Sequence, residues 1–89
     1  MRKNCVLYES TADYHIASIF SWYFDDCIVV PVANYEKDLG KNIYIIGGIA
    51  EIKFKAKYLP DKYIAFTGID RFETLDKAMC YAKSHGFYN

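Results

Sequence analysis

The sequence predicts a small α+β fold, in which a mainly antiparallel sheet of four to five strands carries two helices packed on one face. Short apolar runs bounded by Gly, Pro and Asp recur along the chain, as the strands of a sheet do. Near each end, apolar residues instead recur at helical spacing. The expected element order is therefore β-α-β-β-β-β-α, in a single domain that spans residues 1–89.

The first strand is expected over residues 4–9, and a helix follows it. Ser10 or Thr11 can cap the helix, with Asp13 as an acidic residue in its first turn. A strand is the alternative for residues 12–24, because aromatic residues alternate there in part. The helical interpretation is favoured by apolar residues at intervals of three and four, namely Ala12, Ile16, Ile19, Phe20 and Tyr23.

Two strands are expected in the middle of the chain. The first covers residues 27–33, and Pro31 indicates an edge strand or a bulge because proline cannot donate a ladder hydrogen bond. After a polar loop over residues 36–42, a second strand covers residues 43–46. Gly47-Gly48 is then either a two-residue hairpin turn or a bulge within one longer strand.

Residues 51–58 show the clearest pattern, because apolar side chains alternate with Glu and Lys. A period of two with one apolar face is typical of a half-buried strand. Pro60-Asp61 indicates a turn, and residues 63–67 are expected to return as the next strand.

The chain is expected to close with a helix capped by Thr74 and stopped by Gly86. Its buried stripe would contain two alanines, which allow a close approach to the sheet, and consists of Leu75, Ala78, Met79 and Ala82.

Composition restricts the function more than it defines it. The 89 residues include nine Tyr, and the 11 basic and 11 acidic side chains cancel, which argues against a strongly basic nucleic-acid binder. Cys5, Cys27 and Cys80 are widely spaced among apolar neighbours and are expected to be buried, reduced thiols of a cytoplasmic protein. We expect no membrane span, no metal site and no cofactor. No spacing of potentially catalytic residues indicates an enzyme.

A partner-binding surface is the site that the sequence favours. Lys53, Lys55 and Lys57 would form a ladder on one strand face beside Tyr58 and Tyr63, suited to phosphates or an acidic protein surface. The alternative is a solvated face whose charges discourage edge pairing.

The first predicted helix supplies two further candidates. Trp22 and Tyr14 on that helix are candidate interface anchors. A helix with so little polar surface is usually covered on more than one side, which predicts a homodimer through this helix.

The expected function is therefore a non-catalytic protein-binding module that acts as an inhibitor or regulator. In size and composition the chain resembles the small anti-defence inhibitors that phages and mobile elements encode, although no motif carries that resemblance. A regulator that binds nucleic acid through the lysines and tyrosines is the alternative, and a protein partner is favoured over it.

Overall fold

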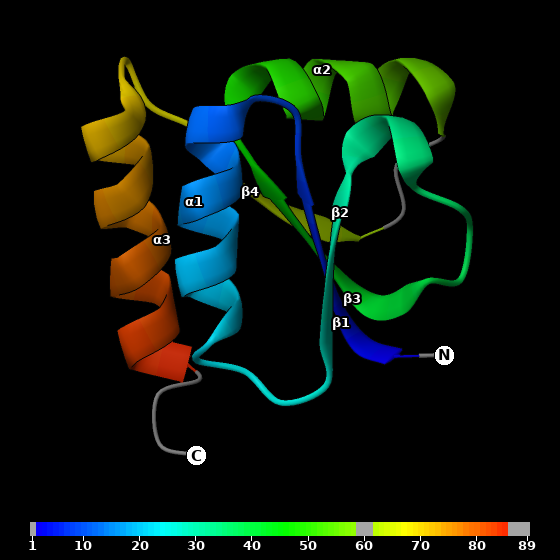
Figure 1. The fold of residues 1–89 in the computed structure, drawn as a ribbon, viewed down its shortest axis with the longest axis horizontal. Helices are drawn as coiled ribbons and strands as arrows, with labels where there is room; N and C mark the ends of the chain where they lie inside the picture. Colours follow the sequence, from blue (N-terminus) through cyan, green and yellow to red (C-terminus); the bar gives the residue numbers. More distant parts are fainter. Residues whose placement is uncertain (1, 59–61, 86–89) are drawn as a thin grey trace.

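The computed structural model describes residues 2–58 and 62–85, which form a parallel sheet between layers of helices (Figure 1). In chain order the elements are β1 Arg2–Tyr8, α1 Thr11–Ser21, β2 Cys27–Pro31, the short 3₁₀ helix η1 Val32–Asn34, β3 Gly40–Ile46, α2 Gly48–Lys57, β4 Tyr63–Phe66 and α3 Arg71–His85. The predicted turn at Pro60-Asp61 and the helix stop at Gly86 lie outside the described residues.

The sheet has the order β2-β1-β3-β4, and each pair of neighbouring strands is parallel. The predicted antiparallel α+β fold with two helices on one face is therefore wrong, and the architecture is α/β with three α-helices. Parallel neighbours cannot be joined by a hairpin and need a crossover, which α1 supplies between β1 and β2 and α2 supplies between β3 and β4. The edge position predicted for the strand that contains Pro31 is confirmed, because β2 borders the sheet.

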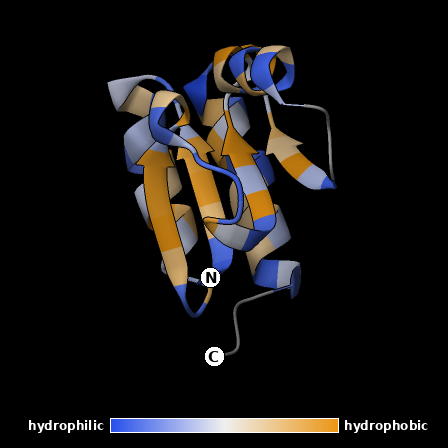
Figure 2. Cartoon of the chain, turned by 90° about the vertical axis from the view of Figure 1, so that its right-hand side faces the viewer, coloured by the Kyte–Doolittle hydropathy of each residue, from blue (hydrophilic) through white to orange (hydrophobic). Residues whose placement is uncertain are grey.

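Each face of the sheet covers its own apolar core, and Figure 2 shows the inner strands as largely hydrophobic. The core under α1 and α3 centres on Phe20, whose ring contacts the rings of Tyr44 and Phe66. The core under α2 and η1 centres on Phe54, with Leu7 and Ile45 from the strands. Apolar residues on both faces of β1 and β3 are the pattern of a parallel sheet covered on two sides.

The largest local correction concerns residues 48–57, which form the helix α2 and not a strand. In this helix Ala50 and Phe54, four residues apart, face the sheet, while Ile52 is 69% exposed. The strand interpretation placed Ile52 and Phe54 on one face. The segment contains Ala, Glu and Lys, which favour helices, so its composition opposes the strand that the alternating pattern predicts. The crossover between two parallel strands also requires a helix or a similarly long connection here.

Gly47-Gly48 is neither a hairpin turn nor a bulge but the junction where the chain passes from β3 into α2. Gly47 has a positive φ of 97°, and its N–H donates to the Phe66 carbonyl at 2.8 Å. A β-carbon at Gly47 would overlap the carboxylate of Asp13 on α1. Only glycine combines this backbone angle with such a close approach.

Residues 12–24 contain the predicted helix rather than the alternative strand. The Asp13 N–H donates to Ser10 Oγ at 3.2 Å, so Ser10 is the N-cap. The sequence predicted that α1 is covered on more than one side. Besides the sheet, α3 of the same chain packs against α1 (Figure 1). The thin polar face of this helix therefore does not by itself require a second subunit.

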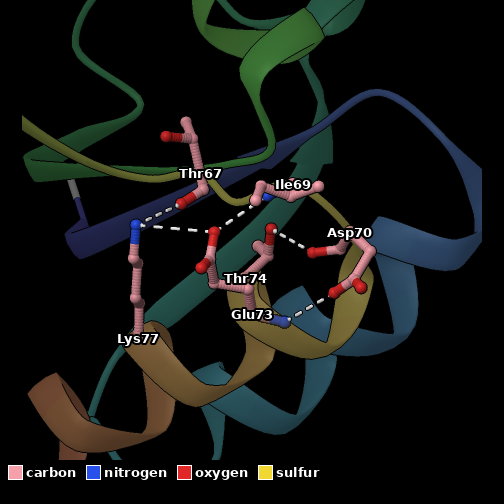
Figure 3. Close-up of polar contacts among 6 residues, drawn as sticks. All are labelled: Thr67, Ile69, Asp70, Glu73, Thr74 and Lys77. Atoms are coloured by element: carbon pink, nitrogen blue, oxygen red, sulfur yellow. Dashed lines mark hydrogen bonds and ion pairs between the residues drawn. The ribbon is translucent and has the colours of Figure 1, made fainter.

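The final helix begins three residues before the predicted cap Thr74, which lies buried within α3. Asp70 Oδ1 accepts the Glu73 N–H at 2.9 Å, and Glu73 Oε1 accepts the Ile69 N–H at 2.8 Å (Figure 3). This reciprocal pair resembles a capping box. Lys77 extends the network to the Thr67 carbonyl at 2.9 Å, so the cap also fixes the chain that leaves β4.

Candidate functional site

The three lysines predicted to form a ladder do not share one face. All three lie on α2, where a helical turn of 3.6 residues places Lys53 and Lys57 on one side and Lys55 on another. Lys53 Nζ pairs with Glu9 Oε2 at 3.0 Å, and Lys57 Nζ lies 5.6 Å from the centroid of the Tyr58 ring. The structure therefore removes the continuous cationic strand face on which the prediction rested.

Two of the predicted tyrosines hold α2 against the sheet. Tyr58 Oη donates to the Tyr35 carbonyl at 2.8 Å, and Tyr63 Oη donates to Glu51 Oε2 at 2.9 Å. Both rings also pack on Phe54, at centroid distances of 5.3 and 5.6 Å. Their positions are thus explained by packing, whether or not they also touch a partner.

Tyr14 and Trp22 lie on α1, and thus on the other side of the sheet from α2. Tyr14 is 42% exposed and its ring meets the Tyr8 ring edge-on at 5.1 Å. Trp22 closes the C-terminal end of α1 and is 79% exposed. The seven predicted residues consequently belong to separate surfaces, and their role in partner binding stays a prediction.

A depression at the amino ends of β3 and β4 brings cationic and aromatic side chains together. Its volume is about 630 Å³. The sheet register aligns Ile43 with Tyr63, so β4 begins beside the fourth residue of β3, and Tyr81 of α3 also lines the depression. We call this feature the amino-edge depression, and it is lined by Lys41, Asn42, Ile43, Tyr44, Lys62, Tyr63, Ile64 and Tyr81.

Two tyrosines that line the amino-edge depression, Tyr44 and Tyr63, remain neutral. Burial, together with a hydrogen bond to Tyr81, raises the pKa of Tyr44 well above its usual value. Partial burial, followed by the hydrogen bond with Glu51, also raises the pKa of Tyr63. At neutral pH these groups therefore offer ring surfaces and protonated hydroxyls rather than negative charge.

The two lysines at the rim supply positive charge. Lys41 and Lys62 are both exposed, and no carboxylate of residues 2–58 or 62–85 forms an ion pair with either. Of the residues that line this depression, the sequence singled out Tyr63 alone. The sequence placed Lys41 in a loop and gave no indication of a site at Lys62 or Tyr81. These residues line one depression only because β3 pairs in parallel with β4 and α3 packs beside them.

The opposite, carboxyl edge of the sheet is where ligands usually bind in open α/β folds, at the point where the strand order reverses. Here that point lies between β1 and β3. The Asp13 carboxylate lies against Gly47, and the Glu9–Lys53 ion pair joins the residue after β1 to α2. These contacts bring protein side chains into the region that a ligand would otherwise use.

Two of the three cysteines, Cys5 and Cys27, have the environments expected of unreactive thiols. Burial is the main cause that raises the pKa values of Cys5 and Cys27 from 9.0 to about 11, so both stay protonated at neutral pH. Cys80 is exposed. Within the described part of the chain, no three His, Cys, Asp or Glu side chains are grouped as metal ligands would be, and no helix is long and apolar enough to span a bilayer.

The sequence matches no family model and no curated protein. In fold, the chain is similar to the crystal structure of the endolysin CTP1L, whose activity is regulated by a secondary translation product, with 24% identity and a TM-score of 0.72 over 92% of this chain and 98% of that one. It is similar to the C-terminal domain of a CTP1L variant with reduced autoproteolysis, with 24% identity and a TM-score of 0.71 over 91% and 95% of the two chains.

These likenesses support the α/β fold and correct the expected function. The matching structures belong to an endolysin, not to an anti-defence inhibitor or to a nucleic-acid-binding regulator.

Proposed function

We propose that this chain is a non-catalytic binding domain that attaches to the bacterial cell wall. Endolysins degrade that wall, and the observation that carries the proposal is the likeness of fold to an endolysin and its C-terminal domain. The likeness covers more than nine tenths of both chains, so it concerns the whole domain rather than a shared supersecondary motif.

The chemistry of the described residues supports binding over catalysis. The thiols of Cys5 and Cys27, with pKa values near 11, are poor nucleophiles at neutral pH. The amino-edge depression instead presents tyrosine rings and two exposed lysines, a combination that suits recognition of a polar polymer. Attachment to the wall needs such a surface and does not need a general acid, a general base or a nucleophile.

Co-sedimentation with purified bacterial sacculi tests this proposal. The chain, fused to a fluorescent protein, is expected to pellet with the sacculi, while the fluorescent protein alone stays in the supernatant. Turbidity of the same suspension is expected to stay constant, because the domain binds without cleaving. A fusion that remains in the supernatant, or a falling turbidity, would contradict the proposal.

The homodimer through α1 is retained as a separate part of the proposal. A groove of about 250 Å³ runs between α1 and α3, lined by Ile16, Ile19 and Leu75 and bordered by Phe72, which is 64% exposed. Light scattering at high protein concentration is expected to give twice the mass of one chain. A Phe72→Ser variant should then shift the mass toward the monomer, and a wild-type monomer would remove the dimer.

A further inference from the structure

The outward side of α2 carries an apolar stripe that no other described element covers. Ala50 and Phe54 turn inward to the sheet. The helical repeat therefore places Ile49, Ile52 and Ala56 together on the opposite side. Ile49 is 63% exposed, Ile52 is 69% exposed, and Ala56 is exposed as well. Exposed apolar surface with a polar rim is typical of a site that contacts a protein or a membrane.

Lysines border this outward stripe on both sides. Lys53 and Lys57 follow one edge of the stripe, and Lys55 follows the other. Glu9 already pairs with Lys53. In residues 2–58 and 62–85 no carboxylate forms an ion pair with Lys55 or Lys57. The acidic residue of α2, Glu51, lies beside the sheet and accepts a hydrogen bond from a tyrosine of β4, so the rim of the stripe is cationic.

The shape and charge of this face favour a flat anionic surface over a protein groove. Figure 1 shows α2 at the outside of the molecule, so the stripe is convex and open. At an anionic bilayer, two isoleucines can enter the boundary between headgroups and acyl chains. The long lysine stems can lie along apolar surface while their ammonium groups stay at the lipid phosphates. One set of side chains thus meets both parts of a lipid surface.

We propose that the outward face of α2 binds the surface of a membrane that contains anionic lipids, with Ile49 and Ile52 at the headgroup boundary and Lys55 and Lys57 at the lipid phosphates. Such binding lies on the bilayer and needs no helix that spans it. It goes beyond the proposed attachment to the cell wall and does not depend on it. The affinity should fall as ionic strength rises, because salt screens exposed charges.

The test measures co-sedimentation of the wild-type chain with two kinds of vesicle. One kind contains phosphatidylglycerol and phosphatidylcholine in equal parts, and the other contains phosphatidylcholine alone. The wild type is expected to bind the anionic vesicles about tenfold more tightly or better, because each lysine near an anionic surface strengthens binding about fivefold.

Two matched pairs of variants locate the site. Ile52→Ser removes an apolar side chain from the stripe, and its control Ile69→Ser removes one from the loop after β4, where Ile69 is 94% exposed. Lys55→Gln removes one charge from the rim, and its control Lys83→Gln removes one exposed charge from α3 on the other side of the sheet. Ile52→Ser and Lys55→Gln should each weaken binding to anionic vesicles about fivefold or more, and the controls should bind as the wild type does. Circular dichroism checks that the variants fold, and Ile52→Ala replaces Ile52→Ser if that variant does not.

Other outcomes overturn the proposal. Absence of wild-type binding to the anionic vesicles, or equal binding to both kinds, would refute an anionic lipid surface as the ligand. Unchanged binding of folded Ile52→Ser and Lys55→Gln would exclude this face of α2. Poly-L-glutamate that displaces the chain from vesicles as readily as anionic lipid does would assign the face to an acidic protein surface instead.

Two controls keep this inference separate from the rest. Light scattering in which Ile52→Ser alone halves the mass of the wild type would assign the stripe to a second copy of the chain. A wild type that pellets with sacculi but not with anionic vesicles would overturn the membrane inference and leave the attachment to the wall intact.

Discussion

Replacing Ile52 and Phe54 separately distinguishes the helix α2 from the strand that the alternating pattern predicts. On a strand both side chains would face the core, so truncating either to Ala would cost about 2–5 kcal/mol. On α2 only Phe54 is buried, at 2% exposure, whereas Ile52 is 69% exposed. The two substitutions should therefore have very different effects on the free energy of unfolding.

The structure allows both magnitudes to be worked out. Phe54→Ala removes the central ring of the core under α2 and should cost about 3–5 kcal/mol. Fully burying an Ile side chain stabilises a protein by about 1.5–3 kcal/mol, and Ile52 is buried to about a third, so Ile52→Ala loses about a third of that free energy. The higher helix propensity of Ala offsets up to about 0.7 kcal/mol of the loss. The net change at Ile52 should lie within about 0.5 kcal/mol.

Urea unfolding followed by circular dichroism measures both changes. A domain of 89 residues is expected to unfold with a free energy of about 4–13 kcal/mol, so Phe54→Ala can remove most of the stability. Phe54→Leu therefore serves as a milder variant that keeps part of the core filled. With an m-value of about 1 kcal/mol/M, Ile52→Ala should shift the midpoint by less than about 0.5 M. A loss above about 2 kcal/mol at Ile52 would refute the helix.

Two further predictions concern the carboxyl edge of the sheet and the thiols. Gly47→Ala should lower the free energy of unfolding by about 1–3 kcal/mol in the same urea assay, because Gly47 has a φ of 97° and its β-carbon would clash with Asp13; a variant as stable as the wild type would argue against this junction. The free energy of unfolding should also fall as the pH rises from about 9 to about 11, because the unfolded thiols of Cys5 and Cys27 lose their protons near pH 9.0 while the folded ones keep theirs to about 11. Cys5→Ala/Cys27→Ala should flatten that part of the pH profile, and an unchanged slope would show that these thiols do not cause it.

Local sequence signals were sufficient for several elements. Of the two expected caps, Ser10 is the N-cap, and of the edge strand or bulge indicated by Pro31, the edge strand is found. These features depend on residues close together in sequence, so propensity and capping chemistry determine them. The same holds for β4, where the predicted and observed strands share residues 63–66.

The strand directions and the site depended on contacts distant in sequence. Residues 51–58 fit a period of two, and a helix there becomes favourable only because parallel β3 and β4 need a crossover. Runs such as Cys5-Val6-Leu7 already carried the signal of a strand covered on both faces, which the prediction of one helix layer did not use. The amino-edge depression was missed because Lys41 and Lys62, 21 positions apart, line the same depression only through that parallel pairing.

The central place of β1 has a consequence for how the chain folds. Its two partners, β2 and β3, begin at Cys27 and Gly40, so β1 must wait for chain that is synthesised after it. Until then Val6 and Leu7, both fully buried in the finished sheet, are exposed to water. Non-local pairing slows folding and leaves apolar strands open to aggregation. We therefore expect the apolar residues of β1 to depend on the ribosome or chaperones for protection from water until β3, which ends at Ile46, has been synthesised.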